Sequence, residues 1–471
     1  MTSQAVGWKR VGVMGLGLSG CASARFLARR GVQVTAADSK ERSGIAEAAE
    51  LESLGVRLVL GADAGREQVF AQCEAVVASP GVPPGVPALA GAAAAGVPVL
   101  AEVELAFRWL RGVLIGITGS NGKSTVTELT GRILRQAGLP TRVCGNIGTP
   151  LIEVVEQDQA LAVAEASRVH YVVELSSFQL EGIRTLAPRV AVLLNLSPDH
   201  QDRYASPGDY FAAKARLFMN QRGDDIAIIN WDDPPSLRLA ERLAARLFPF
   251  SLSHDLEDGA VLCEGNLVLR RLGRDESILP ASEVPLRGRH NLENVLAAAA
   301  AAAHCGASAQ AAAQAIRSFR GLSHRLEFVA DVSGVAYYND SKATNVGATL
   351  RAVEAFHEPL VLLLGGYDKG GEFEELRGPL SAGSGRVRAV ITFGQAGEDI
   401  AARLQGAAPG LVRAGSLADA VKAAATCARG GDVVLLAPAC ASFDAYSGYA
   451  ERGEDFRRIV QAMAPSRGGR G

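Results

Sequence analysis

Short apolar runs that end in glycine-rich or polar turns recur along the whole chain, and helical patterns lie between many of them. The runs predicted to be strands are 10–14, 32–37, 58–60 and 75–79, then 98–100, 113–117, 171–173 and 190–194, and finally 335–339, 360–364, 389–393 and 432–437. Strands that alternate with helices predict an α/β fold with parallel sheets. Ligands of such sheets bind at the carboxyl ends of the strands, so we expect the chemistry in the turns that follow these runs.

The same pattern divides the chain into domains. A chain of 471 residues is too long for a single hydrophobic core. We expect three domains: a Rossmann-like N-terminal domain (1–110), a central P-loop ATPase-like domain (111–321) and a Rossmann-like C-terminal domain (322–471). The polar segment 320–325 is typical of a linker and sets the last boundary.

The most informative turn lies at the start of the central domain. It reads Gly119-Ser120-Asn121-Gly122-Lys123-Ser124-Thr125 and leads into a helical pattern over 125–137. A strand, a glycine turn, a lysine with a hydroxyl and a helix form the layout of a phosphate-binding loop. Lys123 would reach the terminal phosphates and Ser124 would hold Mg²⁺. The strict motif has another glycine where Ile117 stands, so an ordinary strand-to-helix turn is the alternative.

Glycines also follow the first predicted strand. Gly15, Gly17 and Gly20 are spaced as G-x-G-x-x-G, and Asp38 ends the next strand. This is the formal fingerprint of a dinucleotide-binding fold, so an NAD- or FAD-dependent oxidoreductase is one hypothesis. The same glycines serve any ligand with a diphosphate, and a tight turn without a ligand is a third interpretation.

In the central domain two further strands end in side chains that can do chemistry. Glu174 follows the run at 171–173, and His200 lies in the turn after 190–194. Both would face the same sheet edge as Lys123. A carboxylate beside a phosphate loop is a natural Mg²⁺ ligand, and an imidazole can hydrogen-bond to phosphate. Each residue alone is typical of a loop, but together they predict a site.

A lysine lies in an otherwise apolar helical stripe. One face of the helix that begins at Ser206 contains Tyr210, Lys214, Leu217 and Phe218. The common case is a lysine whose ammonium group reaches water along the stripe. The alternative is a partly buried amine with a lowered pKa, which can take up CO₂ and give a carbamate able to ligate Mg²⁺.

Polar side chains also open an alanine-rich helix. His290, Asn291 and Asn294 stand at its start. They are either helix caps or contacts to a nucleotide base.

Three predicted strands of the C-terminal domain end in polar loops. These loops cover 339–345, 365–371 and 438–444, and they contain two lysines, several hydroxyls and aspartates. Solvated turns are the simpler interpretation. Three such loops at one sheet edge favour a small, doubly charged carboxylate as ligand.

Composition narrows the class of protein. The chain is 48% hydrophobic and 21% charged, with a net charge of −2, which indicates a soluble globular protein without an electrostatic reason to bind nucleic acid or a membrane surface. The seven dispersed cysteines indicate reduced thiols. No apolar run approaches the about 20 residues that span a bilayer, and no signal layout opens the chain. We therefore expect a cytoplasmic protein.

The segments described above resemble the Mur ligase family, the ATP-dependent amino-acid ligases of peptidoglycan precursor synthesis. The motifs that carry the resemblance are G-S-N-G-K-S-T at 119–125, E-L-S-S-F-Q-L at 174–180, S-P-D-H-Q-D-R-Y at 197–204, H-N-L-E-N at 290–294, H-R-L-E at 324–327, N-D-S-K-A-T-N at 339–345 and P-A-C-A-S-F-D at 438–444. Their order and spacing cover nearly the whole chain. The segments at 339–345 and 441–453 are most similar to members that join D-glutamate to UDP-N-acetylmuramoyl-L-alanine.

The resemblance implies a role for each matching residue. ATP would contact Gly119, Ser120, Asn121, Gly122, Lys123, Ser124, Thr125, Asn291, Asn294, Arg325 and Asp340. Two Mg²⁺ ions would be held by Ser124, Glu174, His200 and a carbamylated Lys214, and the catalytic residues would be Lys123, His200 and Lys214. The UDP-sugar would contact Leu18, Ser19, Ser39, Lys40, Asn146 and Ser176. D-Glutamate would contact Lys342, Thr344, Lys369, Ser442, Phe443 and Tyr449.

The family also implies how the protein works in the cell. Its partners would be small-molecule substrates only, without nucleic acid or membrane, and it would act as a monomer in cell-wall biogenesis, and so in cell shape and cell division. Three alternatives remain: the NAD-linked oxidoreductase, a nucleotide-binding switch without catalysis, and another ligase of the same family, such as a folate polyglutamate or different muramoyl-peptide ligase.

Overall fold

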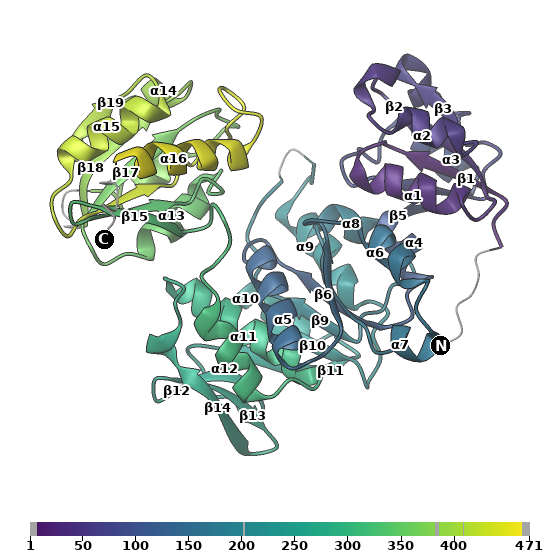
Figure 1. Cartoon of the computed structure of the whole chain (residues 1–471), viewed down its shortest axis with the longest axis horizontal. Coiled ribbons are helices and arrows are strands. Elements are labelled where there is room, and N and C mark those ends of the chain that lie inside the picture. The colour runs from purple at the N-terminus through teal and green to yellow at the C-terminus, as the bar shows by residue number, and fades with distance from the viewer. Residues whose placement is uncertain (1–6, 201–202, 382–385, 408, 464–471) are drawn as a thin grey trace, which may run out of the picture. The chain divides into compact units, whose positions relative to one another are not determined.

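The computed structural model describes residues 7–200, 203–381, 386–407 and 409–463. The chain forms two compact units, one made of residues 1–284 and 293–318 and the other of residues 285–292 and 319–471. The first unit contains two sheets and the second contains one (Figure 1). All three are α/β layers, as the sequence pattern predicted, and the domain boundaries at 110/111 and 321/322 stay predictions.

The first sheet is parallel throughout and has the strand order β3-β2-β1-β4-β5. Its strands are β1 (Arg10–Met14), β2 (Gln33–Asp38), β3 (Arg57–Leu60), β4 (Ala75–Ala78) and β5 (Val99–Ala101). The helices of this purple region of Figure 1 are α1 (Leu18–Ala28), α2 (Ala48–Ser53) and α3 (Pro87–Ala94). The central strands β1 and β4 are almost fully buried, because helices cover both faces of such a sheet.

The second sheet, in the order β14-β13-β12-β11-β10-β9-β6-β8-β7, carries the phosphate-loop motif. Its strands are β6 (Val113–Thr118), β7 (Thr141–Gly145), β8 (His170–Glu174), β9 (Val190–Leu193), β10 (Ile226–Asn230), β11 (Arg246–Ser251), β12 (Gly259–Cys263), β13 (Asn266–Arg271) and β14 (Arg274–Pro280). The helices that follow are α5 (Lys123–Gln136), α6 (Leu151–Asp158), α7 (Val163–Ala166), α8 (Ser177–Glu181), α9 (Pro207–Ala215), α10 (Pro234–Ala240), α11 (Arg289–His304) and α12 (Ala309–Ser318).

Five strands of this sheet lie between 194 and 335, where the sequence predicted none: the parallel strands β10 and β11, and the edge strands β12, β13 and β14. β12, β13 and β14 pair antiparallel through two tight turns. Glu264-Gly265 and Leu272-Gly273 form these turns with positive φ at both residues. A turn with two left-handed residues matches the twist of a hairpin, and the second residue is a glycine in both cases. The alternation along these strands is too weak for the pattern to have shown them.

The third sheet has the order β15-β16-β20-β17-β18-β19, with only β15 antiparallel. Its strands are β15 (Glu327–Val332), β16 (Val335–Asn339), β17 (Leu360–Gly365), β18 (Val387–Phe393), β19 (Leu411–Arg413) and β20 (Val433–Leu436). Its helices are α13 (Val346–Glu354), α14 (Gly397–Leu404), α15 (Leu417–Cys427) and α16 (Tyr449–Met463). The predicted strands at 335–339 and 360–364 are confirmed to within one residue, because both are uninterrupted apolar runs.

The short helix α4 (Glu102–Phe107) fixes the first sheet to the second through two buried carboxylates. Glu104 accepts hydrogen bonds from the backbone N–H groups of residues 184–186 at 2.9–3.1 Å. Glu102 accepts one from the N–H of Ile152 at 2.6 Å, at the start of α6. Carboxylates satisfy backbone donors that would otherwise be buried without a partner.

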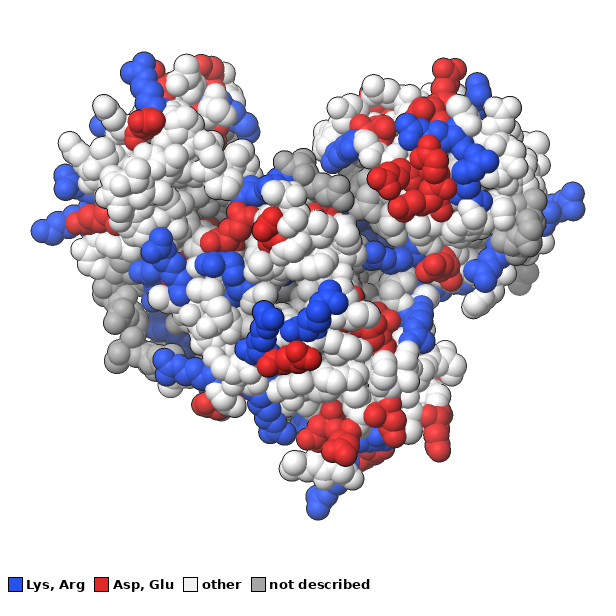
Figure 2. Space-filling view, turned by 180° about the vertical axis from the view of Figure 1, so that it is seen from behind, with Lys and Arg blue, Asp and Glu red and all other residues white. Residues whose placement is uncertain are grey.

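The surface mixes both signs of charge. On the face shown in Figure 2, acidic and basic side chains are interspersed over most of the area. None of the helices in the described ranges combines the length and the hydrophobicity that a bilayer span requires.

Glu102 predicts a pH dependence of stability. Burial raises the pKa of this carboxyl group from 4.5 to about 7. The folded state therefore keeps the proton at pH values where the unfolded chain has lost it, so the contribution of Glu102 is fully present below pH 4.5 and is lost as the pH rises through 7. The Glu102→Gln variant should escape this loss, which amounts to at most about 3 kcal/mol. Denaturant unfolding of both proteins from pH 5 to pH 8 measures it, and parallel curves would contradict the prediction.

Candidate nucleotide and substrate site

The turn after β6 has the backbone of an anion-binding loop. Gly119 and Gly122 have φ values of +154° and +86°, which only glycine adopts without strain. A Cβ on Gly122 would lie 2.3 Å from the Oδ1 of Asn294, so the turn also needs glycine for space. Because Gly122 is the N-cap, α5 begins at Lys123, two residues earlier than the sequence pattern predicted.

A second turn, after β9, holds the loop in this shape. The N–H of Asn121 donates to the Oδ1 of Asn195 at 2.9 Å, and the Nδ2 of Asn195 donates to the carbonyl oxygen of Asn121 at 3.2 Å. The hydroxyl of Ser120 donates to the carbonyl oxygen of Ser197 and accepts from its N–H, both at 2.9 Å. Asn195 was not among the predicted site residues, although it lies directly beside a quoted motif. Its role follows only from the pairing of β6 with β9.

Two lysine side chains share one acceptor at this loop. The Nζ atoms of Lys123 and Lys214 each lie 2.9 Å from the carbonyl oxygen of Gly119. Lys123 also donates to the carbonyl oxygen of Ser120 at 3.1 Å. Two ammonium groups this close repel each other, so the site favours either the loss of one proton or the arrival of an anion.

Lys214 is the lysine that this arrangement changes most. It is 1% exposed, and its Nζ lies 4.6 Å from the ring centre of Tyr210. Burial, and then the charge of Lys123, hold the pKa of Lys214 well below its usual value, against the opposing effect of Asp199 and Glu174. Of the two interpretations that the sequence left open, the structure therefore shows the buried amine and not the lysine that reaches water.

Glu174 has one buried oxygen without a partner. Its Oε1 accepts a hydrogen bond from the Nδ2 of Asn146 at 2.8 Å, whereas its Oε2 is buried and has no hydrogen-bond partner among the described residues. Such an oxygen is costly unless a cation or a donor meets it. The carboxylate therefore fits a divalent cation, since oxygen is the ligand that Mg²⁺ prefers.

His200 lies among aromatic rings, and its Nε2 is 3.8 Å from the Oδ2 of Asp199. Its imidazole lies 4.8 Å from the ring of Phe178 and 6.0 Å from that of Tyr210, between ring centres. Its backbone has a φ of +53°, and residues 201 and 202 of its motif lie outside the described ranges. No group of three or more His, Cys, Asp and Glu side chains within those ranges could hold a metal ion. A metal at this sheet edge would thus need other ligands, such as a hydroxyl, a phosphate or a modified lysine.

Asp38 does not have the geometry of a dinucleotide-binding acid. Its Oδ2 accepts from the N–H of Leu16 at 2.6 Å, and its Oδ1 accepts from the N–H of Lys40 at 2.8 Å. The side chain is buried, and both of its oxygens accept hydrogen bonds from backbone N–H groups of the adjacent turns. A ribose would therefore not find the free carboxylate that the NAD hypothesis requires.

The residues predicted to bind the UDP-sugar lie at two places. Leu18 is 72% exposed at the start of α1, and Ser19 follows it with its hydroxyl 3.4 Å from that of Ser79. Ser39 and Lys40 are exposed directly after β2, the strand next to β1. These four thus share one sheet edge. The other two predicted contacts lie at the second sheet: Asn146, described above, and Ser176, whose hydroxyl caps α8.

In the second unit, the three polar loops follow three adjacent parallel strands. Lys342 follows β16, Ser442 follows β20, and Lys369 follows β17. Each lysine lies over a ring: the Nζ of Lys342 is 3.8 Å from the ring centre of Tyr449, and the Nζ of Lys369 is 5.4 Å from that of Phe443. The prediction that these loops meet at one sheet edge is confirmed. Thr344 is half-buried in the first of them.

Asp340 stands at the base of the first loop. Burial raises the pKa of its carboxyl group to about 7, against a hydrogen bond from the N–H of Leu326 and the charge of Arg325. Asn291 donates from its Nδ2 to the carbonyl oxygen of Arg287 at 2.7 Å. Asp340, Arg325 and Asn291 belong to the second unit, whereas the phosphate loop and Asn294 belong to the first.

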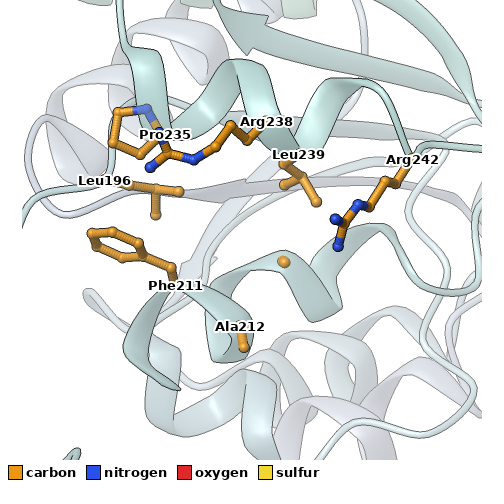
Figure 3. Close-up of a pocket in the computed structure, with 8 residues that line it drawn as sticks. Leu196, Phe211, Ala212, Pro235, Arg238, Leu239 and Arg242 are labelled. Atoms are coloured by element: carbon orange, nitrogen blue, oxygen red, sulfur yellow. The ribbon is translucent and has the colours of Figure 1, made fainter. Parts of the chain in front are cut away.

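A cavity of about 260 Å³ lies between α9 and α10 (Figure 3). It is lined by Leu196, Phe211, Ala212, Ala215, Pro235, Arg238, Leu239 and Arg242. None of the predicted site residues lines it.

Comparison with known proteins assigns all three regions to one family. Residues 9–101 match the N-terminal domain described as Mur ligase MurD-like, residues 117–302 match the Mur ligase middle domain, and residues 324–440 match the Mur ligase glutamate ligase domain. The chain is 46% identical to the UDP-N-acetylmuramoylalanine–D-glutamate ligase of Acidobacterium capsulatum, over 96% of both chains. It is 45% identical to the ligase of the same name from Solibacter usitatus, over 96% of this chain and 98% of that one.

Solved structures agree on the fold. A pseudomurein peptide ligase of type C from Methanothermus fervidus is 16% identical and matches with a TM-score of 0.59, over 97% of this chain and all of that chain. The UDP-N-acetylmuramate–alanine ligase of Thermotoga maritima is 17% identical and matches with a TM-score of 0.56, over 97% of this chain and 99% of that one. With relatives this similar along nearly its whole length, the chain belongs to the Mur ligase family.

Proposed function

We propose that this chain joins D-glutamate to UDP-N-acetylmuramoyl-L-alanine, with hydrolysis of ATP to ADP and phosphate, in the synthesis of peptidoglycan precursors. The relatives that match it over nearly the whole length carry the name of that ligase. The observation that carries the proposal is the phosphate loop, where two lysines meet on the carbonyl oxygen of Gly119. A nucleotide switch without catalysis would have no use for a second, buried amine at that point.

The chemistry requires activation of a poor electrophile. The carboxylate of the acceptor's L-alanine would attack the γ-phosphorus of ATP, giving an acyl phosphate and ADP. The amine of D-glutamate would then attack the acyl carbon, and phosphate would leave as the amide bond forms. Both steps concentrate negative charge on phosphoryl oxygens, so the enzyme's contribution is positioning and positive charge.

Lys123 supplies the first of these charges. In the present arrangement its ammonium group is held by two loop carbonyls, and it needs only a side-chain rotation to meet a phosphate at the N-terminus of α5. The backbone N–H groups of residues 119–125 would complete the cradle. His200, half-exposed beside Phe178, would donate to the transferring phosphoryl group.

We propose that two Mg²⁺ ions are held by Ser124, Glu174, His200 and a carbamate on Lys214. When bound, Mg²⁺ would offset the charge of the phosphates. The Oε2 of Glu174, which is buried without a hydrogen-bond partner among the described residues, supports Glu174 as a ligand. To form the carbamate ligand, the neutral amine of Lys214 would bond to the carbon of CO₂ and release a proton. The remaining N–H could still donate to the carbonyl oxygen of Gly119. The product is an anion beside Lys123, which turns a repulsion into an attraction.

The loops of the second unit are the proposed D-glutamate site. Lys342 and Lys369 offer one charge each for the two carboxylates, and Thr344, Ser442, Phe443 and Tyr449 would surround the ligand. Each ammonium group lies over an aromatic ring, which orients it at the edge of the sheet. Leu18, Ser19, Ser39, Lys40, Asn146 and Ser176 are the proposed contacts of the UDP-sugar, and Asn291, Asn294, Arg325 and Asp340 those of ATP.

Replacing Lys123 should abolish catalysis. We expect Lys123→Ala to lower phosphate release by at least about a thousandfold when ATP, UDP-N-acetylmuramoyl-L-alanine and D-glutamate are supplied, because the charge that stabilises the transferring phosphoryl group is lost. Lys422, exposed on α15, provides the matched control. Lys422→Ala should retain activity, and release at a near wild-type rate by Lys123→Ala would refute the assignment.

The carbamate can be observed directly. Protein equilibrated with ¹³C-bicarbonate should show a carbamate carbon resonance in its NMR spectrum that is absent from Lys214→Arg and present in Lys422→Ala. The lowered pKa of Lys214 supplies the neutral amine that the reaction needs. Signal loss on acidification should accompany loss of activity. Identical spectra for wild type and Lys214→Arg would remove the carbamate from the proposal.

Asp340 predicts a pH dependence of ATP binding. With a pKa of about 7, its carboxyl group loses its charge as the pH falls from 8 to 6. The neutral carboxyl group is a weaker hydrogen-bond acceptor for ATP than the carboxylate is. The KM for ATP should therefore rise in acid for the wild type, whereas Asp340→Asn should start from a higher KM at pH 8 and change less. The titration of ATP itself affects both proteins, so the difference between the two profiles isolates Asp340. Parallel profiles would contradict the prediction.

A further inference from the structure

The second unit contains a buried arginine to which the sequence analysis gave no role. Arg452 lies in the first turn of α16 and is 0% exposed. Its Nε donates to the Oγ of Ser341 at 2.9 Å, and one terminal nitrogen donates to the carbonyl oxygens of Ser341 and Cys440 at 2.9 and 3.0 Å. The other donates to the carbonyl oxygens of Ala441 and Gly365 at 3.0 and 3.4 Å.

These acceptors lie in two loops and at the strand end from which a third loop begins. Ser341 lies after β16, Gly365 ends β17, and Cys440 and Ala441 lie after β20. A planar guanidinium group has five N–H donors in a fixed fork, which is why one side chain can bind three loops at once. A lysine, with a single nitrogen, could not reach the same set.

All five acceptors are neutral oxygens. Burial of a charge that makes no hydrogen bond to a carboxylate is costly. It lowers the pKa of Arg452 to about 10, against the opposing effect of Asp444, and the group stays charged near neutral pH. A cation that is retained in this way adds positive potential to the loops above it. The nearest neighbours of its acceptors in the chain are Lys342, Ser442 and the 366–371 loop with Lys369.

We propose that Arg452 is the positioning residue of the amino-acid site: it fixes the three loops in register, so that Lys342, Lys369 and Ser442 face one dicarboxylate. The inference rests on the proposed D-glutamate ligase function. The guanidinium group does not touch the substrate and acts through the backbone that it binds.

The packing around Arg452 leaves the loops little freedom. Gly366 has a φ of +129°, and a Cβ there would lie 2.2 Å from the carbonyl oxygen of Ala441 and 2.8 Å from a terminal nitrogen of Arg452. Tyr367 pairs with Ala441 as an antiparallel bridge. The hydroxyl of Ser341 donates in turn to the carbonyl oxygen of Tyr449 at 2.8 Å, so the ring beneath Lys342 belongs to the same network.

Steady-state kinetics test the proposal in the full-length enzyme. For Arg452→Gln we expect the KM for D-glutamate to rise by about tenfold or more, the size expected for a lost charge-assisted contact, with the KM for ATP within about twofold of wild type. Arg452→Lys keeps the charge but not the forked donor geometry, so its KM for D-glutamate should lie between those of the wild type and Arg452→Gln. The matched control is Arg388→Gln, which breaks the ion pair with Asp432 at the opposite end of the same strands and should leave the KM for D-glutamate unchanged.

A second variant keeps the test decisive if Arg452→Gln does not fold. Ser341→Ala removes the acceptor of Nε and the donor to Tyr449 without burying or removing a charge, and it should raise the KM for D-glutamate several-fold at near wild-type thermal stability. A purely structural arginine would lower thermal stability and leave the KM for D-glutamate unchanged in Ser341→Ala and Arg452→Lys. That outcome would overturn the proposal.

Hydrogen exchange without substrates separates this inference from the proposed function. In Ser341→Ala and Arg452→Lys, amides in 339–345, 365–371 and 439–444 should exchange faster together, while Arg388→Gln leaves them as in the wild type. Faster exchange confined to α16 would show that Arg452 does not hold the loops. If the wild type fails to use D-glutamate at all, the proposed function fails, and the exchange data still decide whether one arginine sets the loops.

Discussion

The carbonyl oxygen of Gly119 accepts hydrogen bonds from two lysines, and the first unit is arranged so that it can. The oxygen lies in the turn after β6, Lys123 is the first residue of α5, and Lys214 lies in α9, almost 100 residues later in the chain. Glycines at 119 and 122 allow the turn, and Asn195 with Ser197 prevents it from relaxing. Burial, and then the charge of Lys123, lower the pKa of Lys214 at this oxygen. The geometry is one that an anion completes, whether a phosphate, a carbamate or both.

The second unit also contains a buried cationic side chain that donates to backbone carbonyl oxygens, here an arginine. The buried Arg452 donates hydrogen bonds to neutral oxygens, and the two lysines of the loops that it binds lie over aromatic rings. In both units cationic side chains therefore contact neutral oxygens or aromatic rings. Carboxylates and phosphates are stronger partners for such groups than a carbonyl oxygen or an aromatic ring is. This common principle fits a reaction in which an acid, a triphosphate and a dicarboxylic amino acid must meet.

The glycine-rich turn of the first domain shows how far a motif can mislead. Gly15, Gly17 and Gly20 followed by Asp38 satisfy the dinucleotide fingerprint on paper. In the structure Asp38 instead binds the N–H groups of Leu16 and Lys40 and so shapes the edge at which Leu18, Ser39 and Lys40 are exposed. The spacing of residues gives the turn, but the direction in which a carboxylate points depends on which backbone donors lie nearer than a ligand.

The sequence by itself determined the α/β class, most of the parallel strands and the phosphate loop, because uninterrupted apolar runs and glycine turns are local properties of the chain. It also placed Glu174, His200 and the three polar loops at strand ends. Only the tertiary structure decided that Lys214 is buried, that Glu174 keeps one oxygen without a partner, and that β12 to β14 form an antiparallel edge. Asn195 and Arg452 lay within or beside quoted motifs, yet their functions depend on partners up to 111 residues away. Desolvation and long-range hydrogen bonds are sums over residues that the chain brings together only when it folds, so no local pattern can report them.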